Sequence, residues 1–156
     1  MIRKMLIANR GEIAVRVIRA CREMGIETVA VYSTADKECL HVQLADHAVC
    51  IGPPPSSKSY LNKDALITAA LCTGCDAVHP GVGFLSENAD FAREVEKSGM
   101  FWIGPKPDTI EMLGDKVRAR ETAQKSGLPI TPGSAGAITT KEQAVETANK
   151  CGYPII

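Results

Sequence analysis

A lysine at the start of an expected helix is the residue whose position points most directly to chemistry. Lys116 follows Gly114 and Asp115, and Asp115 is suited to cap a helix that begins there. A lysine in the first turn opposes the helix dipole, because that end of a helix carries partial positive charge. A phosphate group would explain it, since exposed helix amides and the ammonium group would then face one anion. A surface lysine screened by solvent is the competing interpretation, and the spacing alone slightly favours it.

A second candidate is the loop over 79–88, His-Pro-Gly-Val-Gly-Phe-Leu-Ser-Glu-Asn. It follows an expected strand, at the edge where open α/β sheets bind ligands. Gly81 and Gly83 would let the backbone approach a flat ligand closely, and Ser86 is placed to cap the next helix. The same residues also fit a plain turn, in which the glycines adopt positive φ and His79 is hydrogen bonded at the strand end. The pattern favours neither interpretation.

Two other motifs have weaker links to chemistry. The first strand-to-helix turn holds one glycine, Gly11, and so lacks a G-x-G-x-x-G dinucleotide loop, although Asp36 stands where a ribose-binding acid would. A plain turn is the favoured interpretation. Cys72 and Cys75 form a C-x-x-C without a second pair at ligand spacing, which disfavours a zinc or redox site. We therefore expect no metal site in this chain.

The first expected helix has a charged stripe. Opposite its apolar face gather four charged side chains, Glu12, Arg16, Arg19 and Glu23. The stripe is either a solvated face supported by i,i+4 ion pairs or an interface between subunits. The pattern alone favours the solvated face.

Short apolar runs alternate with stretches of helical periodicity, and these elements must position the motifs. Strands are expected at 5–8, 28–32, 48–51, 77–79 and 101–103. Helices are expected at 11–24, 38–46, 63–73, 87–98, 107–113, 115–126 and 140–150. This alternation predicts a Rossmann-like α/β domain with a parallel, doubly wound sheet. A domain boundary is expected near Gly114, and a strand that starts at Tyr153 and stops at Ile156 is typical of a fragment.

Size and charge bound the class of protein. The 156 residues suffice for one domain with a real core and the beginning of a second. Because 18 basic residues balance 18 acidic ones, a nucleic-acid partner is not expected. The first apolar run is too short for a signal peptide or a membrane span, so we expect a cytoplasmic protein with no membrane partner and reduced cysteines.

Five stretches of the sequence together resemble the biotin carboxylase family within the ATP-grasp superfamily. They occur in the family's order and spacing over essentially the whole chain. The stretches are Ile7-Ala-Asn-Arg-Gly-Glu-Ile-Ala-Val-Arg16, Ser56-Ser-Lys-Ser-Tyr-Leu61, His79-Pro-Gly-Val-Gly-Phe-Leu-Ser-Glu-Asn88, Phe101-Trp-Ile-Gly-Pro105 and Leu113-Gly-Asp-Lys116.

The resemblance implies a pre-ATP-grasp domain over 1–113 and the incomplete beginning of an ATP-grasp domain over 114–156. It implies that Lys116 contacts ATP phosphates, that Gly81 and Gly83 approach biotin, and that Arg16, Arg19 and Glu23 lie in a homodimer interface. The catalytic groups of the family would then lie downstream of residue 156.

The implied activity is that of an ATP-dependent ligase. With ATP and magnesium or manganese, such enzymes convert bicarbonate to carboxyphosphate and then carboxylate biotin. The biotin is borne by a carrier protein or domain, and a carboxyltransferase component uses it, as in acetyl-CoA carboxylase. Propionyl-CoA, pyruvate and urea carboxylases share this segment, so the acceptor stays open, as does the choice between a separate subunit and a multidomain chain.

The chain departs from the family pattern at two positions. Val82 stands where the family usually has tyrosine, and it offers neither a ring face nor a side-chain hydrogen bond to biotin. Leu113 replaces a methionine of similar volume. Other pre-ATP-grasp ligases would lack the 79–88 motif, and a dinucleotide-binding module would need a glycine-rich first turn.

Overall fold

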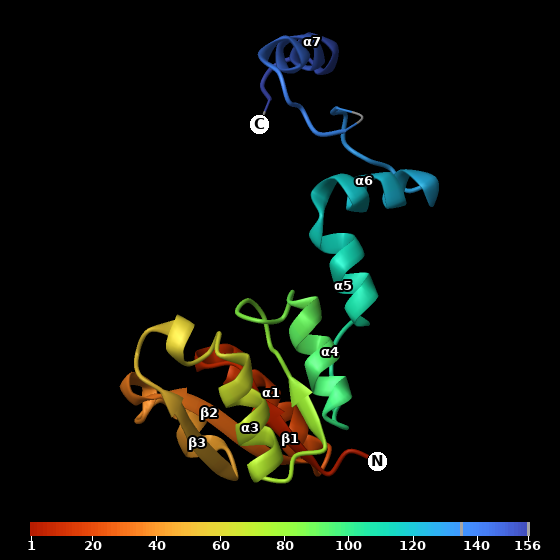
Figure 1. Ribbon diagram of the computed structural model, residues 1–156. Coiled ribbons are helices and arrows are strands. Elements are labelled where there is room, and N and C mark those ends of the chain that lie inside the picture. The colour runs from red at the N-terminus through yellow and green to blue at the C-terminus, as the bar shows by residue number, and fades with distance from the viewer. Residues whose placement is uncertain (135, 156) are drawn as a thin grey trace. The chain divides into compact units, whose positions relative to one another are not determined.

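A computed structural model describes residues 1–134 and 136–155. The chain divides into two compact units, Met1–Glu111 and Met112–Ile156. The first unit is built on one parallel sheet of five strands in the order β3-β2-β1-β4-β5 (Figure 1). The strands are β1 Lys4–Ile7, β2 Glu27–Ser33, β3 His47–Gly52, β4 Ala77–His79 and β5 Phe101–Trp102.

The helices follow the periodicity of the sequence. They are α1 Gly11–Glu23, α2 Leu40–Leu44, α3 Lys63–Cys72, α4 Ala89–Lys97, α5 Pro107–Gly114, α6 Lys116–Lys125 and α7 Lys141–Cys151, with short 3-10 turns at Thr34–Asp36 and Ser56–Lys58. The expected α/β class and parallel sheet are confirmed.

Alternation along the strands divides the apolar residues between two faces. Leu6 and Val78 point to one face, where they join the largest core with residues of α3 and α4. Met5 and Ile7 point to the opposite face and pack against α1. Helices therefore cover both faces, as buried parallel strands require.

The strand order reverses between β1 and β4. The chain leaves β1 through α1 toward β2, whereas from β4 it runs through α4 toward β5 on the other side. Right-handed crossovers in opposite directions put α1 and α4 on opposite faces. The loops that follow β1 and β4 consequently part at the carboxyl edge, which is where open α/β sheets form ligand crevices.

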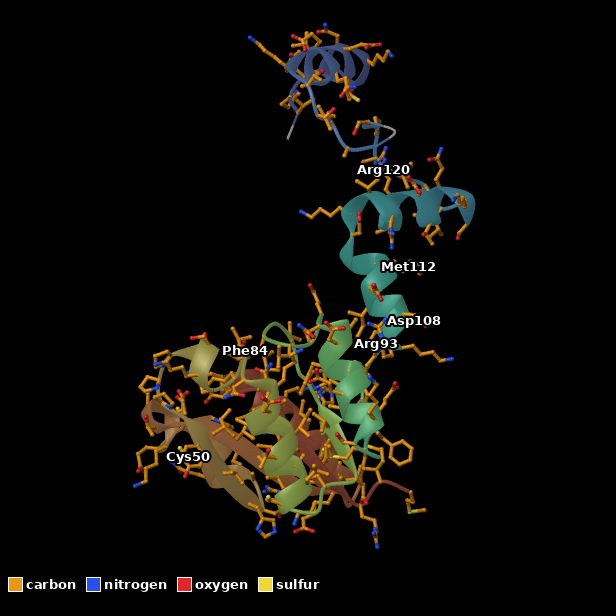
Figure 2. The ribbon with its side chains drawn as sticks, in the orientation of Figure 1. Cys50, Phe84, Arg93, Asp108, Met112 and Arg120 are labelled. Atoms are coloured by element: carbon orange, nitrogen blue, oxygen red, sulfur yellow. The ribbon has the colours of Figure 1, made fainter. Side chains whose placement is uncertain are left out.

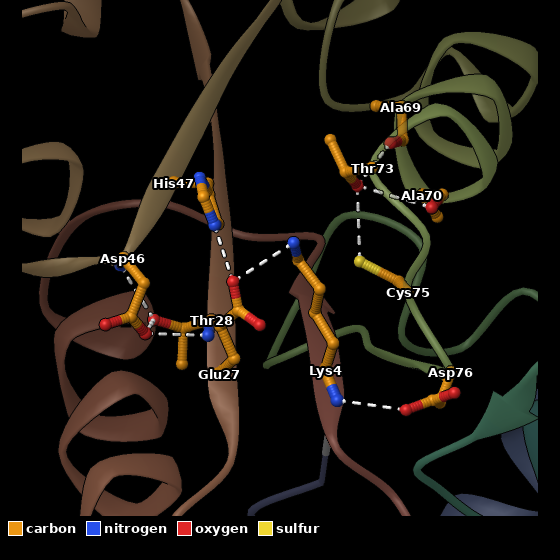
Figure 3. A network of polar contacts seen from close by, with 10 residues as sticks. All are labelled: Lys4, Glu27, Thr28, Asp46, His47, Ala69, Ala70, Thr73, Cys75 and Asp76. Atoms are coloured by element: carbon orange, nitrogen blue, oxygen red, sulfur yellow. Dashed lines mark hydrogen bonds and ion pairs between the residues drawn. The ribbon is translucent and has the colours of Figure 1, made fainter.

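Polar contacts hold the amino edge of the same sheet (Figure 3). The Asp76 carboxylate accepts hydrogen bonds from the backbone N–H groups of Arg3 and Lys4 at 2.8 and 3.1 Å. Glu27 pairs with Lys4 at 3.1 Å and with His47. These contacts link β1, β2, β3 and the start of β4 at the end of the sheet opposite the crevice.

Salt bridges attach the beginning of α5 to α4. Arg93 lies near Asp108 in Figure 2, and its guanidinium donates to that carboxylate at 3.0 Å. It also bonds Glu111 and pairs with Asp90 at 3.3 Å. These acidic partners raise the pKa of Arg93, with Glu111 the largest contributor.

Two local expectations are wrong. Asn88, not Ser86, caps α4, because its side-chain oxygen accepts from the Phe91 N–H at 2.8 Å. Residues 153–155 form no strand. The physical reason is that a strand requires a neighbouring ladder, and the described part of the chain places none beside them. Residue 156, the end of that expected strand, lies outside the described residues.

None of the helices in the described ranges is long and apolar enough to cross a lipid bilayer.

Two histidines of the first unit predict how its stability depends on pH. Burial lowers the pKa of both His41 and His79. As pH falls below the unfolded value near 6.5, the unfolded chain binds protons that the folded chain resists, so stability present above that pH is lost. We expect the free energy of unfolding to fall from pH 7 to 5, by at most about 1.4 kcal/mol per pH unit for each histidine.

Urea unfolding followed by the fluorescence of Trp102 measures this dependence, because that ring is buried edge-on against Phe91. His41→Gln keeps a donor for the Val31 carbonyl, which the ring nitrogen contacts at 3.3 Å, but does not titrate. The free energy of unfolding of this variant should therefore fall less steeply between pH 7 and 5 than that of the unaltered chain. A free energy of unfolding that stays level between pH 7 and 5 would contradict the prediction.

Candidate functional site

Asn9 lies just beyond the end of β1, beside the loop that follows β4. The residue is 3% exposed, and its amide nitrogen donates to the carbonyls of Pro80 and Val82, each at 2.9 Å. Its amide oxygen accepts from the Arg10 N–H at 2.9 Å. The loop after β4 is thereby attached to the residue that follows β1.

The loop turns through three residues with positive φ. Gly81 and Gly83 have φ of 70° and 71°, and Phe84 has φ of 44°. A Cβ on Gly81 would lie 2.5 Å from the Asn9 amide nitrogen, whereas one on Gly83 would meet nothing within 4 Å. Position 81 therefore requires glycine both for its backbone conformation and for the close approach of Asn9.

An aromatic contact supports the other end of the loop. Phe84, labelled in Figure 2, stacks on Tyr60 with ring centroids 5.0 Å apart and an interplanar angle of 19°. Tyr60 is 2% exposed, and its hydroxyl donates to Asp36 at 2.7 Å while accepting from the Ser33 N–H at 2.9 Å. Burial, followed by the hydrogen bond to Asp36, raises the pKa of Tyr60 to about 12.

Asp36 connects the stacked pair of Tyr60 and Phe84 to Arg10. The Arg10 guanidinium forms two hydrogen bonds with the carboxylate, one of them at 3.0 Å, and the Ser33 hydroxyl donates to it at 2.9 Å. Arg10 first, then Tyr60 and Ser33, hold the pKa of Asp36 far below its usual range. Because internal donors occupy the carboxylate, the structure does not support the ribose-binding role considered for Asp36.

His79 supports the start of the loop. Its Nδ1 accepts a hydrogen bond from the Gly81 N–H at 3.0 Å, and burial lowers the pKa of its ring. At neutral pH His79 thus acts as a neutral acceptor whose proton lies on Nε2. The plain-turn features considered for this loop, positive φ and a bonded His79, are both present, and they do not prevent its outer face from binding a ligand.

An apolar groove of about 550 Å³ runs between α1 and this loop. Arg16, Val17 and Cys21 line it from α1, while Gly81 and Val82 line it from the loop. Val82 is 69% exposed. The fold thus brings together Arg16 and Gly81, which the sequence assigned to two different roles.

The other charged residues of α1 lie around that groove or beside it. Arg19 lines a neighbouring surface groove together with Arg16 and the buried His41. Glu23 is exposed at the last position of α1. Among the described side chains, neither arginine has a carboxylate within 4 Å, so the expected i,i+4 ion pairs of a solvated stripe are not formed.

Lys116 is the exposed first residue of α6, in the second unit. Asp115 caps the helix as expected, accepting from the N–H groups of Val117 and Arg118 at 2.8 and 3.2 Å. Because those two amides already donate to Asp115, the Lys116 ammonium group is the main group left to bind an anion. The help from these helix amides that the sequence predicts for Lys116 is therefore reduced.

Sequence reasoning missed Asn9, Arg10 and Tyr60 as supports of the loop. Their signal was present, because Asn9 and Arg10 directly follow the first strand and so had to lie at the carboxyl edge. Tyr60 follows β3 and reaches the same edge by way of Asp36. Only the strand order shows which of these loops are neighbours.

Cys72 is exposed and Cys75 is buried, and both are free thiols. Burial raises the pKa of the Cys75 thiol. Among residues 1–134 and 136–155, no three His, Cys, Asp or Glu side chains gather where they would hold a metal ion.

Comparison with family models identifies the first unit. Residues 1–110 match the model described as "Biotin carboxylase, N-terminal domain". The chain belongs to the biotin carboxylase family. Residues 115–156 match a second model, described as "Carbamoyl-phosphate synthase L chain, ATP binding domain".

Individual biotin carboxylases are similar over the whole chain. Biotin carboxylase 1 of Bacillus subtilis is 60% identical over 156 residues, which are 100% of this chain and 35% of that protein. The biotin carboxylase of Haemophilus influenzae is 57% identical, with the same coverage. The chain thus spans about 35% of the length of these curated relatives.

Solved biotin carboxylases have the same fold. The Campylobacter jejuni enzyme, in a complex with a β,γ-ATP ligand, matches with a TM-score of 0.93 and 45% identity over 99% of this chain and 34% of its own. The biotin carboxylase domain dimer of Hydrogenobacter thermophilus 2-oxoglutarate carboxylase, solved with MgADP, ADP and bicarbonate, matches with a TM-score of 0.91 and 47% identity over the same shares.

Proposed function

We propose that this chain forms the N-terminal part of a longer biotin carboxylase, which uses ATP and bicarbonate to carboxylate carrier-borne biotin. The observation that carries the proposal is the order of the two family matches, a biotin carboxylase N-terminal domain over 1–110 followed by the start of an ATP-binding domain at 115. In this assignment the first domain spans 1–113 and the second begins at 114.

The family resemblance suggests the binding roles, and the site geometry is compatible with them. The outer face of the Gly81 and Gly83 loop would receive biotin, and the exposed ammonium group of Lys116 would contact ATP phosphates. The fold contributes a rigid backbone surface to the first role, because Asn9 and Tyr60 support the loop from within. Bond-making groups would come from the downstream sequence, as would the magnesium or manganese ligands, since the described residues gather no three metal-binding side chains.

The partners follow from the same proposal. Biotin would arrive on a biotin carboxyl carrier protein or domain, and a carboxyltransferase component would use the product. We propose acetyl-CoA as the final acceptor. Solved relatives include a subunit of pyruvate carboxylase and a domain of 2-oxoglutarate carboxylase, which makes these acceptors the alternatives to test. Cytoplasmic localisation stays a prediction, since one relative with 55% identity is named as chloroplastic.

Lys116→Ala in the longer protein tests the proposed activity. A charge-assisted hydrogen bond contributes about 1.5 to 3 kcal/mol, so the KM for ATP should rise by about ten- to a hundredfold. The KM for biotin should be unchanged. Bicarbonate-dependent ATP hydrolysis and carboxylation of free biotin are the measurements.

Lys125→Ala is the matched control, because it removes an exposed lysine from the other end of the same helix. The two variants should differ in KM for ATP alone. If the unaltered longer protein fails to hydrolyse ATP in response to bicarbonate, the proposed function is wrong.

The charged stripe of α1 is proposed as a homodimer contact. A solved relative is described as a biotin carboxylase domain dimer, which supports dimerisation. Arg16→Glu with Arg19→Glu should weaken self-association of the longer protein, because a two-fold interface presents each reversed charge twice. Sedimentation velocity measures the change.

Lys97→Glu with Lys106→Glu makes the same change in net charge at exposed positions outside α1, so it should leave the dimer intact. If the α1 variant dimerises as strongly as the unaltered protein, the stripe is a solvated face and not an interface.

A further inference from the structure

We propose that Asn9 is a positioning residue for the biotin-binding loop, and that Arg10, Asp36 and Tyr60 form a second support for the same loop. The inference rests on the proposed function, because it assigns the Gly81–Phe84 turn to biotin. It goes beyond that function by naming residues that never need to touch the substrate.

The first support runs from Asn9 directly. Both hydrogens of its amide group are used, one on the Pro80 carbonyl and one on the Val82 carbonyl, at 2.9 Å each. Its oxygen is held by the Arg10 N–H, which sets the orientation of the amide. An amide with all its donors engaged and 3% exposure is a fixed group rather than a mobile one.

The second support starts at the next residue. Arg10 pairs with Asp36, Asp36 accepts the Tyr60 hydroxyl at 2.7 Å, and the Tyr60 ring stacks on Phe84 at 5.0 Å. Two consecutive residues after β1 therefore reach the loop by separate routes, one at each end of the turn. The turn between them includes Gly83 and the exposed Val82, so its outer face is open to a ligand.

The supports matter because the turn is intrinsically unfavourable. A positive φ at Phe84 is rare for a residue with a side chain, and it persists only where surroundings impose it. Loss of a support should let the loop adopt other conformations, so the fraction that is competent to bind biotin falls. Binding of ATP, which is assigned to the second domain, should not change.

Asn9→Asp in the longer protein tests the inference. The change keeps the size of the side chain and its acceptor for the Arg10 N–H, but it turns a carboxylate oxygen toward two carbonyl oxygens. With free biotin as the probe, we expect kcat/KM for biotin to fall tenfold or more. The KM for ATP should stay within about twofold, a change worth less than the 1.4 kcal/mol of a tenfold effect.

Asn62→Asp is the matched control, because Asn62 caps α3 by accepting from the Ala65 N–H, a role that aspartate fills equally well. Its kinetics should equal those of the unaltered protein. If Trp102 fluorescence shows that Asn9→Asp does not fold, Tyr60→Phe decides by the same criterion, since it keeps the ring on Phe84 and removes the hydroxyl from Asp36.

Unchanged kcat/KM for biotin in a folded variant, or an equal loss in the parameters for ATP and biotin, overturns the positioning role. Hydrogen exchange of the loop amides separates this failure from failure of the proposed function. If the unaltered protein carboxylates no biotin, the proposed function is wrong. If the loop amides of the Asn9 variant nevertheless exchange faster than those of the unaltered protein, Asn9 still positions the loop.

Discussion

Asp36→Ala is expected to lower the free energy of unfolding of this chain by about 3 kcal/mol, because it leaves buried hydrogen-bond donors without an acceptor. The Ser33 and Tyr60 hydroxyls would lose their shared partner inside the protein. Arg10 would lose less, since its side chain is 45% exposed and can turn to water. Urea unfolding followed by Trp102 fluorescence measures the effect.

The same carboxylate predicts an acid limit. The folded pKa of Asp36 lies far below its unfolded value, so its contribution is present above the unfolded value near 3.9 and is lost as pH falls below it. The difference in stability between the unaltered chain and Asp36→Ala should therefore shrink below pH 4.

Asp64→Ala, at an exposed position in the first turn of α3, is the control and should cost less than about 1 kcal/mol. Equal losses in the two variants would show that the Asp36 contacts contribute nothing specific.

Gly81→Ala is expected to have the second largest effect on stability. The left-handed conformation costs a residue with a Cβ about 1–2 kcal/mol, and overpacking against Asn9 adds about 1–3 kcal/mol. We expect a total loss of about 3 kcal/mol in the free energy of unfolding.

Gly83→Ala is the matched control. Its φ is 71°, nearly that of Gly81, but its added Cβ would meet nothing within 4 Å. It should therefore show the conformational cost alone, about 1–2 kcal/mol. The difference in free energy of unfolding between the two alanine variants measures the effect of the contact with Asn9. Equal losses would mean that the Asn9 side chain moves aside at no cost in free energy.

Local patterns proved sufficient for the secondary structure of the first unit. The short length and β-branched residues of β2 predicted a strand, and the period of the charged stripe of α1 predicted a helix, because each signal belongs to one type of element. The α/β class followed from their alternation, and the confirmed family resemblance from motifs that are linear in sequence. The cap of α4 was misplaced because Ser86 and Asn88 are both good caps, and only the geometry of the turn selects between them.

The roles of Lys116, Gly81 and Gly83 remain predictions, as do those of Arg16, Arg19 and Glu23. What the sequence by itself determined was that a histidine ends the fourth strand and two glycines follow it, and that Asn9 and Arg10 follow the first. Only the tertiary structure decided that these two strands are neighbours, so that Asn9 bonds the loop at Pro80 and Val82. The physical reason is that strand order depends on which buried faces pack together across the whole domain, whereas propensity and period act over a few residues.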